Sequence, residues 1–315
     1  MSKVIMYHYI RSFDENFPYF KFLDLKDFQK QIKFFSKHKE FIKLNDDLNK
    51  EYYKNKYLLT FDDGLKEHLE IAKFLNKKNI SALFFISGLP IEKKEFLPIH
   101  KIHLIFGKLN SSEILDIFKK FKIKFNQKNI FSFFEKQKKF LGKAKNTKEE
   151  DKKIFLKTFL NNIDQKNKTI VNNIFNHCIS KKNQKKIFKN YYMNSNDILE
   201  LDKLGMKIGG HSYHHRVLST LTYDQQKKDI NNTTKILSQL IKKKIKYFCY
   251  PYGGPKVFNQ KTFDILEQEI EWSFNVESKD WSKRSNKLLV PRFDCNEFKF
   301  GKVFEINEKN SNYFS

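Results

Sequence analysis

The stretch YLLTFDDG (residues 57–64) runs from apolar residues directly into two adjacent carboxylates and a glycine. Its first five residues are typical of a buried strand. Buried carboxylates are costly unless they face a site or a cation, so one of Asp62 and Asp63 could hold a metal while the other accepts a proton. An isolated Asp-Asp-Gly is more often a turn in which Gly64 adopts a left-handed conformation. The stretch therefore predicts a strand, and a site only if other motifs support it.

Similar short runs recur on both sides of this stretch and alternate with helical periodicity. Strands are predicted at Lys3–Tyr9, Tyr57–Phe61, Ile80–Ile86, Met206–Gly210, Ile245–Tyr250, Glu271–Val276 and Lys287–Pro291. Amphipathic helices are predicted at Leu25–His38, Leu65–Lys77, Tyr223–Lys243 and Phe258–Ile270. This alternation is typical of an α/β fold in which crossover helices connect a parallel sheet, and closure into a (β/α) barrel is expected.

Residues 90–193 interrupt the alternation with a segment rich in Lys, Asn and Phe. Ser112–Lys124 and Lys148–Asn161 have the pattern of helices, and six apolar side chains supply surface to pack: Phe118, Phe121, Phe155, Phe159, Ile163 and Phe175. We therefore expect a barrel formed by residues 1–89 and 194–315 and a helical insertion formed by residues 90–193, rather than a linker.

The formal charge of +25 comes almost wholly from lysine, since arginine occurs only at Arg11, Arg216, Arg284 and Arg292. Proteins that read phosphates and bases usually use arginine, so no nucleic-acid partner is expected.

The three cysteines are an odd number and too widely spaced for a disulfide framework or a CxxC metal knuckle. Without a recognisable signal peptide or an apolar run of spanning length, the sequence predicts a soluble cytoplasmic protein.

A second polar motif, HSYHH (residues 211–215), follows the strand predicted to end at Gly210. His211 and His215 are four residues apart, so one helical turn would aim both imidazoles at one point, although His214 competes as a ligand. Two histidines and a carboxylate leave a coordination position for water, whose pKa a metal lowers toward neutrality. The carboxyl ends of barrel strands meet at one mouth. The polar residues expected there are His8, Asp62, Asp63, His211, Tyr252 and Arg292.

Three motifs in this order, LTFDDG (59–64), HSYHH (211–215) and YPYG (250–253), resemble those of the polysaccharide deacetylase, or NodB-homology, family, also called carbohydrate esterase family 4. The resemblance covers residues 4–86 and 199–294 and leaves the insertion unmatched. It implies a distorted (β/α) barrel and a metal-dependent hydrolase that removes an N- or O-acetyl group from a sugar or polysaccharide.

The resemblance also implies roles for individual residues. Asp62 would be the general base, and Asp63, His211 and His215 would hold a divalent metal, which we expect to be Zn²⁺, although Co²⁺ or Ni²⁺ would fit the same donors. The acetyl pocket would be formed by Pro251 and Tyr252, with the backbone N–H of Tyr252 stabilising the oxyanion. Trp281, after Asp280, resembles a weaker motif in which tryptophan walls the pocket, but a lone tryptophan is as often part of a core.

Two departures from the family pattern matter. Cys249 stands where many members carry an arginine that orients the base, and Arg292 is expected to replace it. No late Leu-x-His motif follows Arg292, although the family commonly draws its general acid from there. Residues 5–8 (IMYH) resemble the N-terminal Met-Tyr-His of a permuted subgroup that acts on amino-sugar polymers. His8 would then be the general acid, and the alternative is a buried, hydrogen-bonded strand histidine.

The expected substrate is an acetylated sugar, an oligosaccharide or a glycan precursor. Two other functions stay open on the same fold: hydrolysis of a non-sugar C–N amide bond, and glycan binding by a catalytically weak member. Only the lysine count favours a nucleic-acid or membrane-surface protein, and steep salt dependence of binding would be its sign.

Overall fold

The structure is a computed structural model that describes residues 1–44, 48, 55–124, 148–166, 168–282 and 285–304. Contacts between residues divide the chain into two compact units. The first contains Met1–Ser12, Phe22–Phe96 and Lys185–Phe304, and the second contains Phe13–Lys21 and Leu97–Gln184. This division differs from the expected boundaries at residues 90 and 193, because Phe13–Lys21 joins the helical unit and both ends of the expected insertion join the sheet unit.

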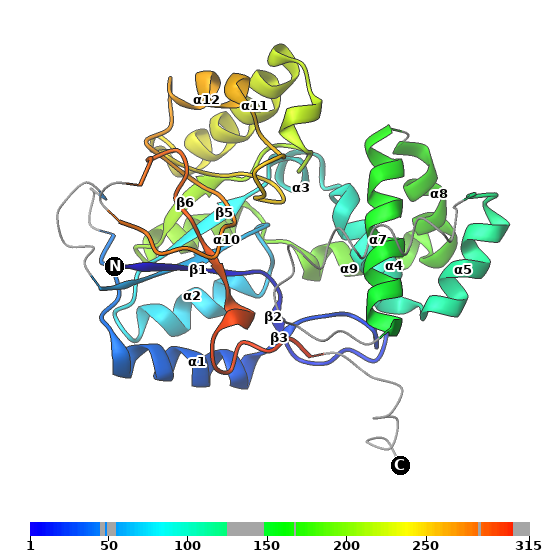
Figure 1. Cartoon of the computed structure of the whole chain (residues 1–315), viewed down its shortest axis with the longest axis horizontal. Coiled ribbons are helices and arrows are strands. Elements are labelled where there is room, and N and C mark those ends of the chain that lie inside the picture. The colour runs from blue at the N-terminus through cyan, green and yellow to red at the C-terminus, as the bar shows by residue number, and fades with distance from the viewer. Residues whose placement is uncertain (45–47, 49–54, 125–147, 167, 283–284, 305–315) are drawn as a thin grey trace. The chain divides into compact units, whose positions relative to one another are not determined.

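The first unit is built on a curled seven-stranded sheet with the order β8-β7-β6-β5-β4-β1-β9 (Figure 1). Every pairing in it is parallel, so the predicted α/β class is confirmed. The strands are β1 (Lys3–Tyr7), β4 (Tyr57–Phe61), β5 (Ala82–Ile86), β6 (Lys207–Gly210), β7 (Tyr247–Cys249), β8 (Trp272–Phe274) and β9 (Phe293–Asp294). A separate short pair is formed by β2 (Ile10–Arg11) and β3 (Leu23–Asp24).

The strand predicted at Lys287–Pro291 is wrong. Lys287 and Leu288 form a turn, and in this segment only Val290 makes a bridge, parallel to Phe274 of β8. The true last strand, β9, begins three residues after Val290 and pairs with β1. Leu288 and Val290 are apolar because they are buried in the core. They do not belong to a continuous series of strand pairings. The segment bridges to β8 at one edge of the curled sheet and leads into β9 at the other edge, in keeping with a distorted barrel.

Helices cover the sheet in the first unit: α1 (Leu25–His38), α2 (His68–Asn76), α3 (Gly88–Lys93), α10 (Ser195–Lys203), α11 (Tyr223–Ile241) and α12 (Gln260–Leu266). α1 occupies the predicted residues because Asp24 caps its first turn and Phe28, Ile32 and Phe35 recur on its buried face. Two 3₁₀ turns, Leu218–Thr220 and Cys295–Glu297, complete the unit.

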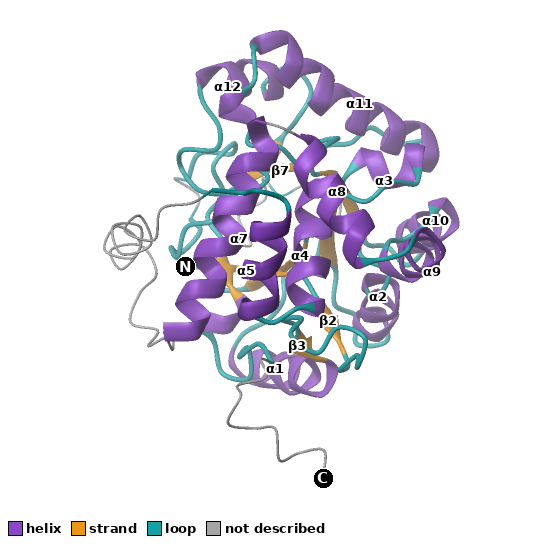
Figure 2. Ribbon diagram, turned by 90° about the vertical axis from the view of Figure 1, so that its right-hand side faces the viewer, coloured by secondary structure: helices purple, strands orange, loops and turns teal. Residues whose placement is uncertain are grey.

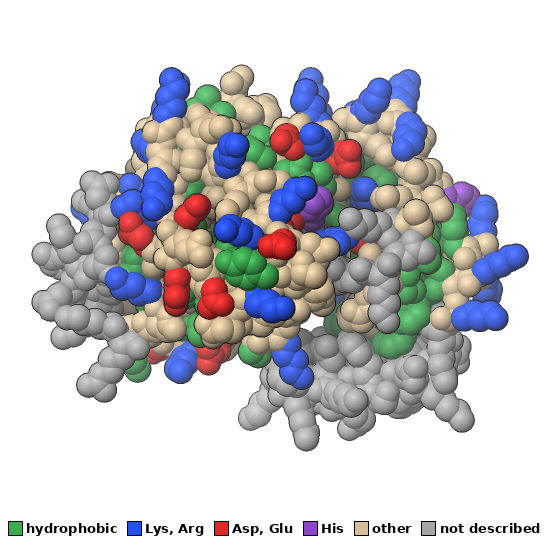
Figure 3. All heavy atoms as spheres, turned by 90° about the horizontal axis from the view of Figure 1, so that it is seen from above, with side chains coloured by type: hydrophobic (Ala, Val, Ile, Leu, Met, Phe, Trp, Pro, Cys, Tyr) green, Lys and Arg blue, Asp and Glu red, His purple; other side chains and the backbone are tan. Residues whose placement is uncertain are grey.

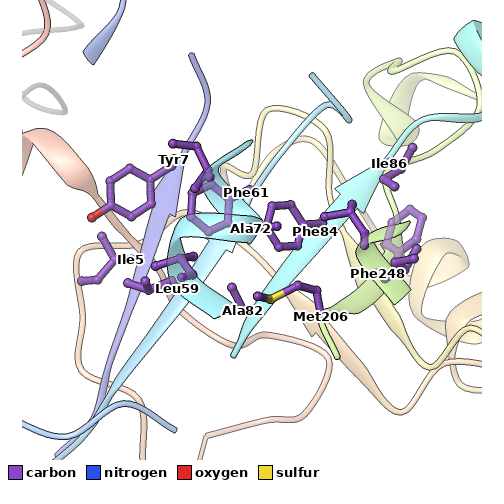
Figure 4. Packing of buried hydrophobic residues seen from close by; sticks show 14 of the residues in the cluster. Ile5, Tyr7, Leu59, Phe61, Ala72, Ala82, Phe84, Ile86, Met206 and Phe248 are labelled. Carbon is purple, nitrogen blue, oxygen red and sulfur yellow. The ribbon is translucent and has the colours of Figure 1, made fainter. Parts of the chain in front are cut away.

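The two faces of the strands bury different clusters of apolar side chains. Ile5, Leu59 and Phe84 belong to the cluster that packs against the helices (Figure 4). Their neighbours Leu58 and Leu83 belong to a second cluster with Trp272, Phe274 and Trp281. This alternation follows from the period of two along a strand and shows that both faces of the sheet are buried.

The described residues of the second unit are mostly helical (Figure 2). Its helices are α4 (Pro98–Lys108), α5 (Ser111–Lys120), α7 (Lys148–Lys166) and α8 (Lys168–Cys178), and α9 (Lys181–Tyr191) begins in this unit and ends in the first. Phe118, Phe155 and Phe175 are buried, as expected of packing residues. Residues 125–147 of the expected insertion lie outside the described residues.

None of the described helices combines the length and the apolar character needed to cross a membrane. Cys178, Cys249 and Cys295 are free thiols. On the face drawn in Figure 3, lysine and arginine side chains are interspersed with acidic and uncharged ones. On this face the positive side chains are dispersed and do not form a single basic patch.

Candidate active site

Asp62 follows the carboxyl end of β4, Asp63 and Gly64 form the turn after it, and both aspartates are buried. The main-chain N–H of Asp62 donates to the carbonyl of Tyr7 at 3.0 Å, which continues the register with β1. Asp63 and Gly64 then adopt left-handed conformations with φ of 78° and 67°. A Cβ on Gly64 would lie 2.8 Å from Ile86 Cγ2, so the position favours glycine. The Asp-Asp-Gly sequence is therefore both a turn and part of the candidate site.

His211 and His215 lie on a loop after β6, so the predicted helical turn is wrong. Ser212 and His215 have positive φ angles of 57° and 54°, which a helix does not allow. The Ser212 hydroxyl accepts the main-chain N–H of His215 at 3.0 Å. This compact loop still brings the two imidazoles together, with ring centroids 4.8 Å apart.

The two imidazoles meet the carboxylate of Asp63. Nε2 of His211 and Nε2 of His215 lie 3.4 Å and 3.5 Å from Asp63 Oδ1. Three ligands of a tetrahedral Zn²⁺, at bond lengths near 2.1 Å, would be separated by about 3.4 Å. The donor set and its spacing therefore fit a divalent cation.

A hydrogen bond orients the His211 ring so that its Nε2 could bind that cation. Its Nδ1 donates to the main-chain carbonyl of Cys249 at 2.9 Å, which directs Nε2 toward Asp63. Burial lowers the pKa of His211, but its interaction with Asp63 and the negative charge of Asp62 outweigh burial and raise it well above its usual value. The position therefore attracts positive charge, whether a proton or a metal ion.

Asp62 is paired with Arg292, which is only 1% exposed. Nη1 and Nη2 of Arg292 donate to the two oxygens of Asp62, each at 2.8 Å. Burial raises the pKa of Asp62, but the guanidinium, with smaller contributions from His211 and His8, lowers it to about 2. The sequence had placed Arg292 in this role, and the structure brings it to the carboxylate.

Three other groups hold Arg292 in place. Its Nε donates to the main-chain carbonyl of Asn275 and its Nη1 to the hydroxyl of Thr60, both at 3.1 Å. Its Nη2 lies 2.9 Å from the sulfur of Cys249. Burial raises the pKa of this thiol, so it stays protonated and donates to Asp62 at 3.5 Å. Thr60 and Asn275 were missed because nothing in their local sequence distinguishes them from ordinary strand residues.

His8 follows the last residue of β1 and lies beside Asp62. Its Nε2 is 3.8 Å from Asp62 Oδ2, and its side chain is 36% exposed. The alternative of a fully buried strand histidine therefore does not apply. The carbonyl of His8 accepts a hydrogen bond from His68 Nε2 at 2.9 Å, which fixes the main chain at this point.

Pro251 and Tyr252 form the turn after β7. The ring of Tyr252 lies 4.9 Å from the ring of His215, so this turn borders the candidate metal ligands. Tyr252 and Gly253 both have φ of 64°, and a Cβ on Gly253 would lie 2.2 Å from Val276 Cγ2. The glycine of the motif is thus required by space as well as by conformation.

Trp281 does not join the other predicted site residues. It forms a bridge with Ser2, before the start of β1, and packs edge-on against Trp272, the first residue of β8, at 5.6 Å. These contacts place it at the amino ends of the strands, whereas the site lies at their carboxyl ends. The prediction that Trp281 walls the pocket is wrong, and it is a core residue.

A curled parallel sheet with carboxylates and histidines at its carboxyl ends is the arrangement that the deacetylase motifs implied. A family model described as polysaccharide deacetylase matches residues 157–269, which include the HSYHH and YPYG motifs. The chain is also 26% identical over 95 residues to the peptidoglycan-N-acetylmuramic acid deacetylase PdaC of Bacillus subtilis. That match covers 30% of this chain and 20% of the relative, so the chain matches only a small part of the relative's length.

Solved structures resemble the chain over most of its length. The deacetylase PplD of Streptococcus pyogenes, solved with acetate, has a TM-score of 0.56 at 12% identity, covering 93% of this chain and 91% of that one. IcaB of Ammonifex degensii has a TM-score of 0.53 at 16% identity, covering 92% and 90%. The resemblance to the polysaccharide deacetylase family is confirmed, and the fold is the distorted (β/α) barrel of that family. The permuted subgroup stays a prediction.

Proposed function

We propose that this chain is a metal-dependent hydrolase that removes an N- or O-acetyl group from a sugar or polysaccharide. One observation carries the proposal: Asp63, His211 and His215 converge on one point beside Asp62, a carboxylate that Arg292 keeps ionised. Buried charges arranged in this way reduce stability unless they are compensated, which favours a functional explanation over a structural one.

Asp62 is the proposed general base. Arg292 bonds to both of its oxygens and so fixes its orientation toward the reacting atoms. With a pKa of about 2, Asp62 is ionised at neutral pH but accepts a proton readily only from an acidified water. Asp62 would therefore act as a base only when a cation bound by the candidate metal ligands acidifies the water.

The proposed cofactor is a divalent cation held by Asp63, His211 and His215. When bound, it would polarise the acetyl carbonyl and acidify the attacking water. Two imidazoles and one carboxylate suit Zn²⁺ best, and Co²⁺ or Ni²⁺ would fit the same donors.

His8 and the turn after β7 complete the proposed mechanism. His8 is half-exposed beside Asp62, where it would protonate the leaving amine or alcohol as the general acid. The main-chain N–H of Tyr252, next to His215, would donate to the oxygen of the acetyl group as negative charge develops there. Pro251 would line the pocket for the acetyl methyl group.

An acetylated sugar, oligosaccharide or glycan precursor is the proposed substrate. The matching family model is named for polysaccharides, and PdaC is named for a sugar of peptidoglycan. Both favour a sugar over a non-sugar amide.

The test is acetate release from N-acetylated and O-acetylated oligosaccharides, nucleotide sugars and a simple non-sugar acetamide. We expect release from at least one acetylated sugar, its loss after chelation and its return when Zn²⁺ is added. Release from the non-sugar acetamide alone would contradict the sugar specificity. Release that survives complete removal of metal would contradict the role of Asp63, His211 and His215.

A further inference from the structure

The loop that carries His211 and His215 adopts a conformation that its own sequence does not favour. Ser212 and His215 lie in the left-handed region, with φ of 57° and 54°. Residues with a Cβ avoid this region, so such a conformation persists only where surrounding groups hold it. Two elements packed around the loop, α3 and α11, provide those groups.

From α11, the buried carboxylate of Asp229 accepts three hydrogen bonds from the middle of the loop. Its Oδ2 accepts the main-chain N–H of Tyr213 at 2.9 Å, and its Oδ1 accepts that of His214 at 3.2 Å. Oδ1 also accepts from the His214 ring, at Nδ1, at 2.6 Å. The main-chain carbonyl of Asp229 lies 3.1 Å from the Tyr213 nitrogen and shares that donor. One side chain that is 5% exposed therefore binds both residues at the centre of the loop.

From the other side, the start of α3 binds the carbonyl groups of the loop. The main-chain N–H groups of Gly88 and Leu89 donate to the carbonyls of Ser212 and Tyr213 at 3.3 Å and 3.1 Å. A Cβ on Gly88 would lie 2.6 Å from Cδ2 of Tyr213, so the close approach needs a glycine. The loop is thus held through its carbonyls by α3 and through its N–H groups by Asp229.

We propose that Asp229 is a positioning residue for the metal ligands, because it fixes the loop segment between His211 and His215. Asp229 touches neither substrate nor cation in this proposal, and the inference rests on the proposed function, which assigns the two histidines to a metal. Hydrogen bonds to a carboxylate are stronger than neutral ones. Asparagine at this position would retain one acceptor and turn an N–H donor toward other donors, so the loop would lose its defined shape.

The test compares Zn²⁺ affinity, measured by competition with a chromophoric chelator, between wild type and the Asp229→Asn variant. The matched control is Asp224→Asn, the same substitution at an exposed position of the same helix. We expect Asp229→Asn to weaken Zn²⁺ binding about 10- to 100-fold, as is typical for partners of metal ligands. The control should bind as wild type does. Excess Zn²⁺ should restore most of the acetate release of Asp229→Asn.

A second variant keeps the inference testable if Asp229→Asn does not fold. Asp229→Glu retains the charge and moves the acceptors by one methylene group, so it should also weaken Zn²⁺ binding while keeping the wild-type circular dichroism. Unchanged Zn²⁺ affinity in a folded variant would overturn the positioning role and leave the proposed function standing. A wild-type protein that binds no Zn²⁺, Co²⁺ or Ni²⁺ would contradict the proposed metal site and this inference together.

Discussion

The two ends of the parallel sheet bury opposite kinds of side chains. After the carboxyl ends of β4 and β6, four charged or imidazole side chains are at most 7% exposed: Asp62, Asp63, His211 and His215. Arg292, which precedes β9, is also buried and donates to Asp62. At the amino ends, Trp272 and Trp281 pack against each other beside Ser2. Burial of charge opposes folding unless partners compensate it, whereas burial of aromatic surface favours folding.

The same strands therefore serve chemistry at one end and stability at the other. β1 begins beside Trp281 through Ser2 and ends at Tyr7, directly before His8, and β8 begins at Trp272. Substitutions at the carboxyl ends should reduce activity, whether or not they also reduce stability, and substitutions at the amino ends should reduce stability and leave the activity of the folded protein unchanged. Single substitutions at each end of the sheet test this difference.

Apart from the proposed base Asp62, the largest loss is expected for His215→Ala, which removes a proposed metal ligand. Acetate release should fall by more than about 100-fold, and Zn²⁺ should no longer raise the melting temperature. The measurement pairs activity with thermal melting in the presence and absence of Zn²⁺. Equal Zn²⁺-dependent stabilisation of wild type and variant would contradict the assignment of His215.

His8→Ala should lower kcat by about 100-fold or more if His8 donates the proton to the leaving group. Zn²⁺ affinity should stay unchanged, because His8 is not among the proposed ligands. A substrate with an acidic leaving group, which needs little protonation, should lose less. The general-acid role would not survive equal losses for acidic and basic leaving groups.

Arg292→Lys keeps the positive charge and removes the two parallel hydrogen bonds to Asp62. We expect kcat to fall by about 10-fold, because lysine does not fix the carboxylate in one orientation. Arg292→Met leaves the buried Asp62 without a partner and should cost about 3–5 kcal/mol of stability. Urea unfolding distinguishes the two variants, and equal stabilities would contradict the pairing.

The same ion pair predicts how stability depends on acid. Because the pKa of Asp62 is lowered to about 2 in the folded protein, its contribution is fully present above its unfolded pKa. That unfolded value is about 3.9, and the contribution should be lost as the pH falls through the folded value. Unfolding free energies at several pH values should show a smaller acid loss from Asp62 in Arg292→Met than in wild type.

The smallest effect on activity is expected for Trp281→Ala. Removing this core side chain should cost about 3–5 kcal/mol of stability, while kcat at a temperature where the variant is folded should equal that of wild type. A large change in kcat or in the Michaelis constant of the folded variant would indicate that Trp281 contacts the substrate and would contradict its assignment as a core residue.

The order of elements and the main site residues could be predicted from the sequence. β4 and α1 have the predicted bounds because each carries a strong local pattern, a five-residue apolar run or a capped amphipathic repeat. Parallel strand ends converge by topology, so the meeting of Asp62 and His211 follows from placing β4 and β6 correctly. Arg292 directly precedes β9, so its pairing with Asp62 was expected from the motif pattern and not from the strand predicted before it.

The remaining features depend on contacts that no local pattern shows. The His211–His215 loop is shaped by Asp229 and by α3, which are distant in sequence, so its spacing resembled a helix. Leu288 and Val290 are apolar because the core surrounds them, which imitates a strand. Trp281 follows an aspartate, as in the expected motif, and only the bridge to Ser2 shows that it lies at the other end of the sheet.

The most direct test of the central claim is acetate release by the Zn²⁺-loaded Asp62→Asn variant beside wild type and Asp202→Asn. Asp202 is a carboxylate of α10 that pairs with Lys243 at 2.7 Å, so it controls for the substitution itself. We predict that Asp62→Asn binds Zn²⁺ but loses acetate release by about 100- to 10,000-fold, whereas Asp202→Asn keeps it. Acetate release by folded, Zn²⁺-loaded Asp62→Asn at the wild-type rate would contradict the account.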